Sequence, residues 1–339
     1  MDTNLKSKGA TREISDRLVP YLEVLAAPAL DEVIKAIKAA PNLGKLDVRG
    51  SMGLTEPLLK LNTLTFDDQA VLILENLDAD FIAIAANELL LDIRNPAYRA
   101  YISRPVGQLE IDIVSALRGG DGGPGANGQD GQGESNRQGL PGGHGLDGGN
   151  GLPGRTRPLP PVFFFIQKLS FGKLGKPSRQ YLYLNFQGLP GGSGGTGGNG
   201  GNGGKGSNGK EGADSAFDCR EGPGRGGDGG NAGRGGKGGT GGTGGNGGSL
   251  YLFAPSADLF DFSTANIEGG VPGRPGDGGD PGSNGRPGLG GPRNGWCGSG
   301  PRGNPGAFPT PATYGPGDSA LAGRRGIQIP HTRDNRDLF

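Results

Sequence analysis

The sequence is poor in the residues that build metal sites, disulfide frameworks and catalytic dyads. Its 339 residues include two histidines, two cysteines and one tryptophan. His144 and His331 have neither the spacing of metal ligands nor that of a catalytic triad. Matches to G-x-G-x-x-G are numerous, but none follows a strand and opens a helix, as a dinucleotide fingerprint does. The sequence therefore predicts a protein that is not an enzyme and has neither a metal nor a cofactor.

Long apolar runs and an excess of either charge are also missing. No apolar run is as long as about 18 residues, the length that a membrane-spanning helix needs. The 34 basic and 34 acidic residues balance, which argues against electrostatic binding to nucleic acid or an anionic membrane. The start, Met1 to Lys8, lacks the apolar core of a secretion signal. We therefore predict no nucleic-acid partner, no membrane span and no classical signal peptide.

Glycine, in contrast, is abundant and periodic. The chain has 74 glycines, and they recur at every third position through most of 119–154, 188–248 and 270–306. A flexible linker has no reason to keep such a phase, whereas three residues per turn is the period of the polyproline-II conformation. Glycine on one edge lets a neighbouring backbone approach and take up the unpaired N–H and C=O groups. The runs therefore predict polyglycine-II helices in a bundle; the alternative is a disordered glycine-rich tail.

The composition of the triplets distinguishes this bundle from collagen. Proline is sparse in the two longest runs, whereas a collagen triple helix needs it in abundance. Many triplets read Gly-Gly-X, and a second glycine per turn opens a second edge to neighbours. The third residue is expected to point outward, and it is polar or charged at Ser193, Thr196, Asn199, Lys237 and Asn246.

Apolar residues are confined to short islands outside these runs. Spacing of i, i+3, i+4 and i+7 predicts an amphipathic helix over 29–39, and a second helix is predicted over 12–26. From residue 58, short apolar stretches recur about every ten residues, which is typical of a sandwich or a solenoid. Residues 109–114 alternate between apolar and polar and predict a further strand.

The predicted fold class is mostly β or irregular. N-terminal helices and a β-sandwich or β-solenoid base carry a bundle of about six antiparallel polyglycine-II helices. The predicted divisions are a helical N-terminal segment 1–57, a β-rich base 58–117 with later strands in 159–186, 250–266 and 326–329, glycine-rich hairpins 118–158, 187–249 and 269–308, and a C-terminal strand and tail 309–339.

Each hairpin leaves the base and returns to it, so the breaks in the glycine period are expected at the far end. These breaks carry the most varied side chains, which we take as candidate binding residues: Glu134, Asn136, Arg137, Phe217, Asp218, Arg220, Asn294 and Trp296. Matched run lengths place Cys219 and Cys297 at similar heights. They either form a disulfide or remain two unrelated thiols beside aromatic side chains that cover the end.

The phased runs resemble two groups of proteins, the glycine-rich antifreeze proteins of snow fleas and the tail-tip adhesins of some bacteriophages. Glycine-rich, collagen-like bacterial proteins share the composition. The resemblance is one of pattern, covers under half of the chain and transfers no site residue. Charged residues such as Arg225, Asp228 and Arg234 interrupt the flat uncharged face that ice binding requires, so antifreeze activity is disfavoured. The adhesin resemblance implies that distal loops bind a receptor.

The sequence thus predicts a non-catalytic structural or adhesive protein that acts outside the cell, on a virion or on a cell surface. Its distal loops would bind a protein or glycan receptor. The alternative is a structural subunit of an extracellular filament, coat or matrix, whose partners are copies of itself. In either case we expect an oligomer or a part of a larger assembly.

Overall fold

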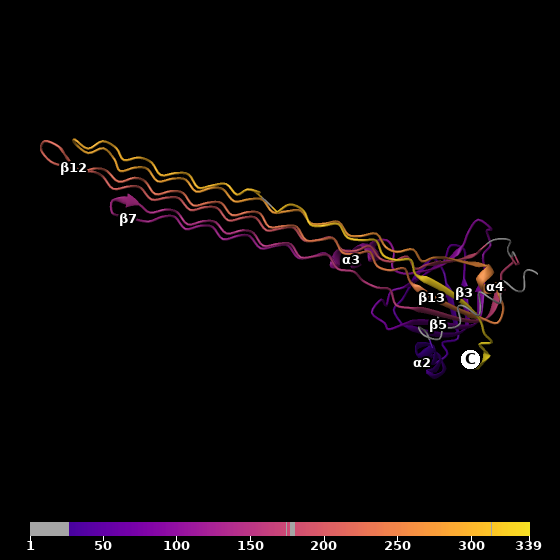
Figure 1. The fold of residues 1–339 in the computed structure, drawn as a ribbon. Helices are drawn as coiled ribbons and strands as arrows, with labels where there is room; N and C mark the ends of the chain where they lie inside the picture. Colours follow the sequence, from indigo (N-terminus) through magenta and orange to yellow (C-terminus); the bar gives the residue numbers. More distant parts are fainter. Residues whose placement is uncertain (1–26, 174, 177–179, 313) are drawn as a thin grey trace, which may run out of the picture.

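A computed structural model describes residues 27–173, 175–176, 180–312 and 314–339. The helix predicted over 12–26 lies outside this part of the chain. The molecule consists of a base, which contains the two large sheets, and a long narrow arm that extends from it (Figure 1). The arm ends at the turns marked by β7 and β12, far from the base.

The base is built on two parallel sheets. The six-stranded sheet has the order β1 (Lys45–Val48), β3 (Leu58–Phe66), β5 (Ile82–Leu91), β9 (Val162–Phe171), β13 (Ser249–Ala254) and β15 (Ile327–Thr332). The five-stranded sheet has the order β14 (Ser263–Asn266), β10 (Leu182–Asn185), β6 (Ala100–Ser103), β4 (Val71–Leu74) and β2 (Ser51–Leu54). Neighbours pair in parallel throughout both sheets. Strands that follow one another along the chain alternate between the two sheets.

Alternate residues of the central strands serve two separate cores. In β9, Phe164 and Ile166 join the core between the sheets, whereas Phe163 and Phe165 face the opposite side. On that side they meet Val33 of helix α2 (Ala27–Ala39) and Leu338 of the short helix η1 (Arg336–Leu338). Both faces of the six-stranded sheet are thus covered, which explains why its central strands read as continuous apolar runs.

Parallel register also stacks aromatic rings across strands. Phe165 lies opposite Phe253 with ring centroids 4.5 Å apart, and His331 continues the stack at 5.1 Å. The C-terminal strand was predicted over 326–329, but edge strand β15 continues to Thr332 and so includes His331. Burial lowers its pKa because the charged imidazolium is disfavoured there.

The predicted fold class was wrong. The structure is an α/β fold with two parallel sheets and few helices, not a β-sandwich or β-solenoid base that carries polyglycine-II helices. Apolar spacing located the strands but carried no information on which strand pairs with which. The glycine runs contain no helix in the described residues. They are extended segments whose N–H groups donate to neighbouring segments rather than within one segment.

Local predictions had mixed outcomes. The helix predicted over 29–39 is present as α2. Residues 109–114 form part of helix α3 (Gln108–Ala116) instead of a strand; none of its residues is buried, so the alternation there does not mark a sheet face. Strands β1 and β2 lie inside the N-terminal segment predicted to be helical, and a short helix, α4 (Asp258–Asp261), precedes β14. In the described residues, no helix has both the length and the apolar content needed to cross a membrane.

The arm consists of six extended segments that run alternately away from and toward the base. We number them in chain order, and they span residues 119–131, 139–155, 188–210, 224–248, 269–291 and 300–326. Outgoing segments follow strands of the five-stranded sheet, and returning segments lead into β9, β13 and β15. The base therefore sets the order of the segments within the arm.

Candidate binding surface at the end of the arm

Backbone hydrogen bonds join the arm segments in a repeating pattern with three positions per triplet. The first-position N–H donates to the segment two further along the chain, as from Gly122 to the Thr196 carbonyl (2.7 Å). The second-position N–H donates back to the preceding segment, as from Gly198 to the Gly149 carbonyl (2.8 Å). Segments two apart run parallel, whereas consecutive segments run antiparallel.

The third position completes the pattern with side chains. Asp121 accepts the Thr196 N–H at 2.7 Å through Oδ1, and Asn199 accepts the Asp280 N–H at 2.9 Å in the same way. The Nδ1 atom of His144 likewise accepts the Asn231 N–H (2.9 Å). These residues are exposed, as predicted for third positions, and in addition they accept hydrogen bonds from neighbouring segments. Their short side chains provide acceptors for N–H groups that no backbone carbonyl reaches, so that backbone donors inside the arm are paired.

The carboxylates among these acceptors make the arm sensitive to acid. Hydrogen bonds from Arg118 and from the Thr196 backbone lower the pKa of Asp121 to about 2. Because this pKa lies below its ordinary value, the contribution to stability is complete above about pH 4 and is lost as the pH falls through about 2. We expect hydrogen exchange at Thr196 to accelerate over that range.

Asp121→Asn is the matched control, because an amide keeps the Oδ1 acceptor without titrating. In this variant the exchange rate of Thr196, corrected for the intrinsic pH effect, should not change between pH 4 and 2. A pH response of equal size in both proteins would contradict the assignment.

A disulfide between Cys219 and Cys297 joins two turns at the end of the arm (Cα–Cα 4.8 Å). Of the two alternatives for the cysteines, the structure therefore has the bridge. Cys219 begins β12 (Cys219–Glu221), which pairs with β11 (Ala213–Asp214) in the turn between the third and fourth segments. Cys297 is 1% exposed and lies in the turn between the fifth and sixth segments.

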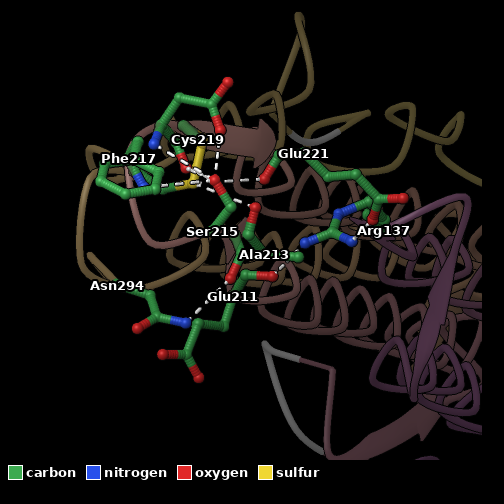
Figure 2. The surroundings of a disulfide bond; sticks show 11 residues. Arg137, Glu211, Ala213, Ser215, Phe217, Cys219, Glu221 and Asn294 are labelled. Atoms are coloured by element: carbon green, nitrogen blue, oxygen red, sulfur yellow. Dashed lines mark hydrogen bonds and ion pairs between the residues drawn. A yellow bond between two sulfur atoms is a disulfide. The ribbon is translucent and has the colours of Figure 1, made fainter.

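The first turn, between β7 (Glu134–Ser135) and β8 (Gln138–Gly139), contacts the second turn at this end of the arm. Arg137 forms an ion pair with Glu221 and donates to the Glu211 carbonyl (Figure 2). From the third turn, the Asn294 side chain donates to the Gly212 carbonyl (3.1 Å). All three breaks in the glycine period thus meet at one end of the arm.

Two aromatic side chains stand out from this end. Phe217 is 88% exposed and Trp296 is 67% exposed. The indole Nε1–H of Trp296 donates to the Ala216 carbonyl (3.3 Å), so its one polar group is used inside the protein and the ring offers an apolar face. Ser215 hydrogen-bonds to Asp218 and fixes the turn that carries Phe217 (Figure 2).

The other predicted site residues divide between internal support and exposure. Arg137, Asp218 and Asn294 are held by the contacts above, and Glu134 pairs with Lys210 (3.4 Å). Asn136 and Arg220 are exposed. Sequence reasoning missed Lys210, Glu211, Ser215 and Glu221, which hold the turns together. No pattern in the sequence singled them out, because their roles arise only when the three turns meet.

The enclosed cavity of the base is too small for a ligand, whereas two open depressions are larger: one of about 430 Å³ on the base beside Pro57, Asn76 and Phe81, and one of about 320 Å³ at the start of the arm beside Arg118 and Pro272. The cavity between the two sheets, lined by Leu64, Phe164 and Leu184 among others, has a volume of about 10 Å³, which is at the limit for a single water molecule. No group of histidine, cysteine and carboxylate side chains in the described ranges is arranged to hold a metal ion. No family model matches the chain, and no curated protein matches it significantly.

Proposed function

We propose that the protein is a non-catalytic binding protein whose arm holds Phe217 and Trp296 out toward a cell-surface or extracellular ligand. The observation that carries the proposal is the exposure of these two rings, which belong to turns at the end of the arm, and this end lies far from the base (Figure 1). Large apolar side chains gain about 1.5–3 kcal/mol each when they are fully buried. Aromatic residues and arginine also dominate the binding energy of known interfaces.

The surroundings of the rings favour binding because they are already ordered. The disulfide and a hydrogen bond from Asn294 join the two turns that carry Phe217 and Trp296, and Arg137 ties the first turn to them. A preorganised surface loses less conformational entropy when it binds a ligand. Disulfides form and persist in oxidising environments, which supports the proposal that the protein acts outside the cell, on a virion or on a cell surface.

Replacing Trp296 by alanine is expected to weaken binding about thirtyfold or more, and Phe217→Ala to weaken it similarly, since truncation of central hot-spot residues costs about 2 kcal/mol or more. The probe is fluorescently labelled protein, titrated onto a panel of intact bacterial and animal cells and onto immobilised glycans. Leu321→Ala is the matched control, because Leu321 is 78% exposed but lies on the sixth segment. Equal binding by all three variants, or no binding by the wild-type protein to any target, would refute the proposal.

A further inference from the structure

We infer that the two long edges of the arm are closed to any further glycine-rich chain, including the arm of a second copy. The arm would then meet its partners with its end and not with its sides. The inference depends on the hydrogen-bond pattern and on the placement of proline and leucine, and it is independent of the ligand proposed above.

Each class of N–H group donates in one fixed direction across the arm, so the backbone groups left without a neighbouring segment differ between its two edges. Each first-position N–H donates to the segment two further along the chain, as from Gly197 to the Asp277 carbonyl (2.8 Å). The fifth and sixth segments have no segment two further along. Glycines at their first positions would present a row of free donors, and such a row is a template for another chain.

Proline interrupts this row of donors. It occupies first positions at Pro272, Pro275, Pro281 and Pro287 in the fifth segment and at Pro305 and Pro316 in the sixth, between first-position residues that keep the N–H, such as Gly278, Asn284 and Arg302. Each of these prolines precedes a second-position glycine that donates to the preceding segment, which fixes its phase. Proline has no N–H group. The inner third and fourth segments need that donor, and residues 191–222 and 224–254 contain no proline.

The opposite edge, on the first and second segments, is obstructed at intervals by side chains, although Gly123 and Gly149 leave the backbone open between them. In the inner segments a Cβ atom at the second position would collide with a backbone two segments earlier, as at Gly198, where it would overlap the Gly123 carbonyl. The second segment instead has Leu140, Leu146 and Leu152 at this position. These side chains are 38%, 61% and 60% exposed, and they project to the side where an added segment would lie.

Proline also acts at this second edge. Third-position N–H groups of the inner segments are accepted by side chains two segments earlier, but the first and second segments have no such neighbours. Pro124, Pro141 and Pro153 stand at third positions there. Addition of one arm to the next by a repeated head-to-tail contact would require free donors on one edge and an unobstructed backbone on the other. Neither edge offers an uninterrupted row of the groups that this contact needs, so we expect that such a contact does not form.

The test opens the edges separately and together. One variant replaces the six first-position prolines by glycine, a second carries Leu140→Gly, Leu146→Gly and Leu152→Gly, and a third combines both sets. Light scattering and negative-stain microscopy would measure mass and arm packing, and hydrogen exchange would show that each arm is formed. Leu321→Gly is the control for loss of an exposed leucine.

We expect single, unpaired arms in the wild-type protein and in both one-edge variants, and at least about a doubling of mass through side-by-side arms in the combined variant. A second measurement uses a labelled peptide with the sequence of residues 224–248, which should bind the combined variant and not the wild type. Side-by-side packing of wild-type arms, or a combined variant that stays single and ignores the peptide, would overturn the inference.

Discussion

Replacing Gly198 by alanine is expected to disrupt the arm around that residue, whereas replacing Gly123 by alanine should have almost no effect. The two glycines face each other in neighbouring segments. A Cβ atom on Gly198 would overlap the Gly123 carbonyl, but a Cβ atom on Gly123 would meet nothing within 4 Å. Overpacking costs about 1–3 kcal/mol, and each backbone hydrogen bond lost with it costs about 1 kcal/mol.

Hydrogen exchange resolved along the chain would measure this effect. Gly198→Ala should remove protection from the amides of Gly198 and Gly201 and from their partners. Gly123→Ala should leave protection unchanged or slightly increased, because alanine reduces the entropy of the unfolded chain. Equal protection in the two variants would show that the close contact between these segments does not exist.

Removing the disulfide is expected to destabilise the end of the arm by about 2–4 kcal/mol. Cys219 and Cys297 are 78 residues apart in sequence, so the bridge restricts a long stretch of the unfolded chain. Cys219→Ser with Cys297→Ser should lower the unfolding temperature and increase exchange at Ala213 and Asn294. Treatment of the wild-type protein with a reductant should have the same result.

Reductant applied to the double serine variant is the matched control and should have no effect. The base should remain folded in both cases, because its two sheets do not depend on the bridge. If the oxidised and reduced proteins unfold identically and show equal exchange at the turns, the bridge contributes nothing to this end of the molecule.

The sequence allowed the arm segments to be located, because glycine occurs in them for a single steric reason. The glycine period marked the segments because inner positions such as Gly198 have no space for a side chain. It also marked the three breaks, which the structure brings together through Arg137, Cys219 and Asn294. The apolar spacing marked α2 in the same way, because one face of that helix packs on the six-stranded sheet.

Features that depend on pairing could not be read from the sequence. Parallel register, such as Phe165 opposite Phe253, follows from how the chain returns to the base and not from either strand. Asn199 has a role only because Asp280 lies beside it, 81 residues later. The support that Ser215 and Glu221 give to the end of the arm likewise depends on neighbours from other turns.

The side-chain acceptors also restrict how the arm can change in length during evolution. Asp121 reaches Thr196 over 75 residues and His144 reaches Asn231 over 87, and both links need the same phase in the two segments. An insertion of one or two residues would rotate every later triplet out of phase. Insertion of one whole triplet into all six segments would preserve it and add at most about 10 Å, since an extended chain rises by no more than roughly 3.3–3.6 Å per residue. Reach would therefore vary among homologues in discrete steps, with balanced insertions on outgoing and returning segments.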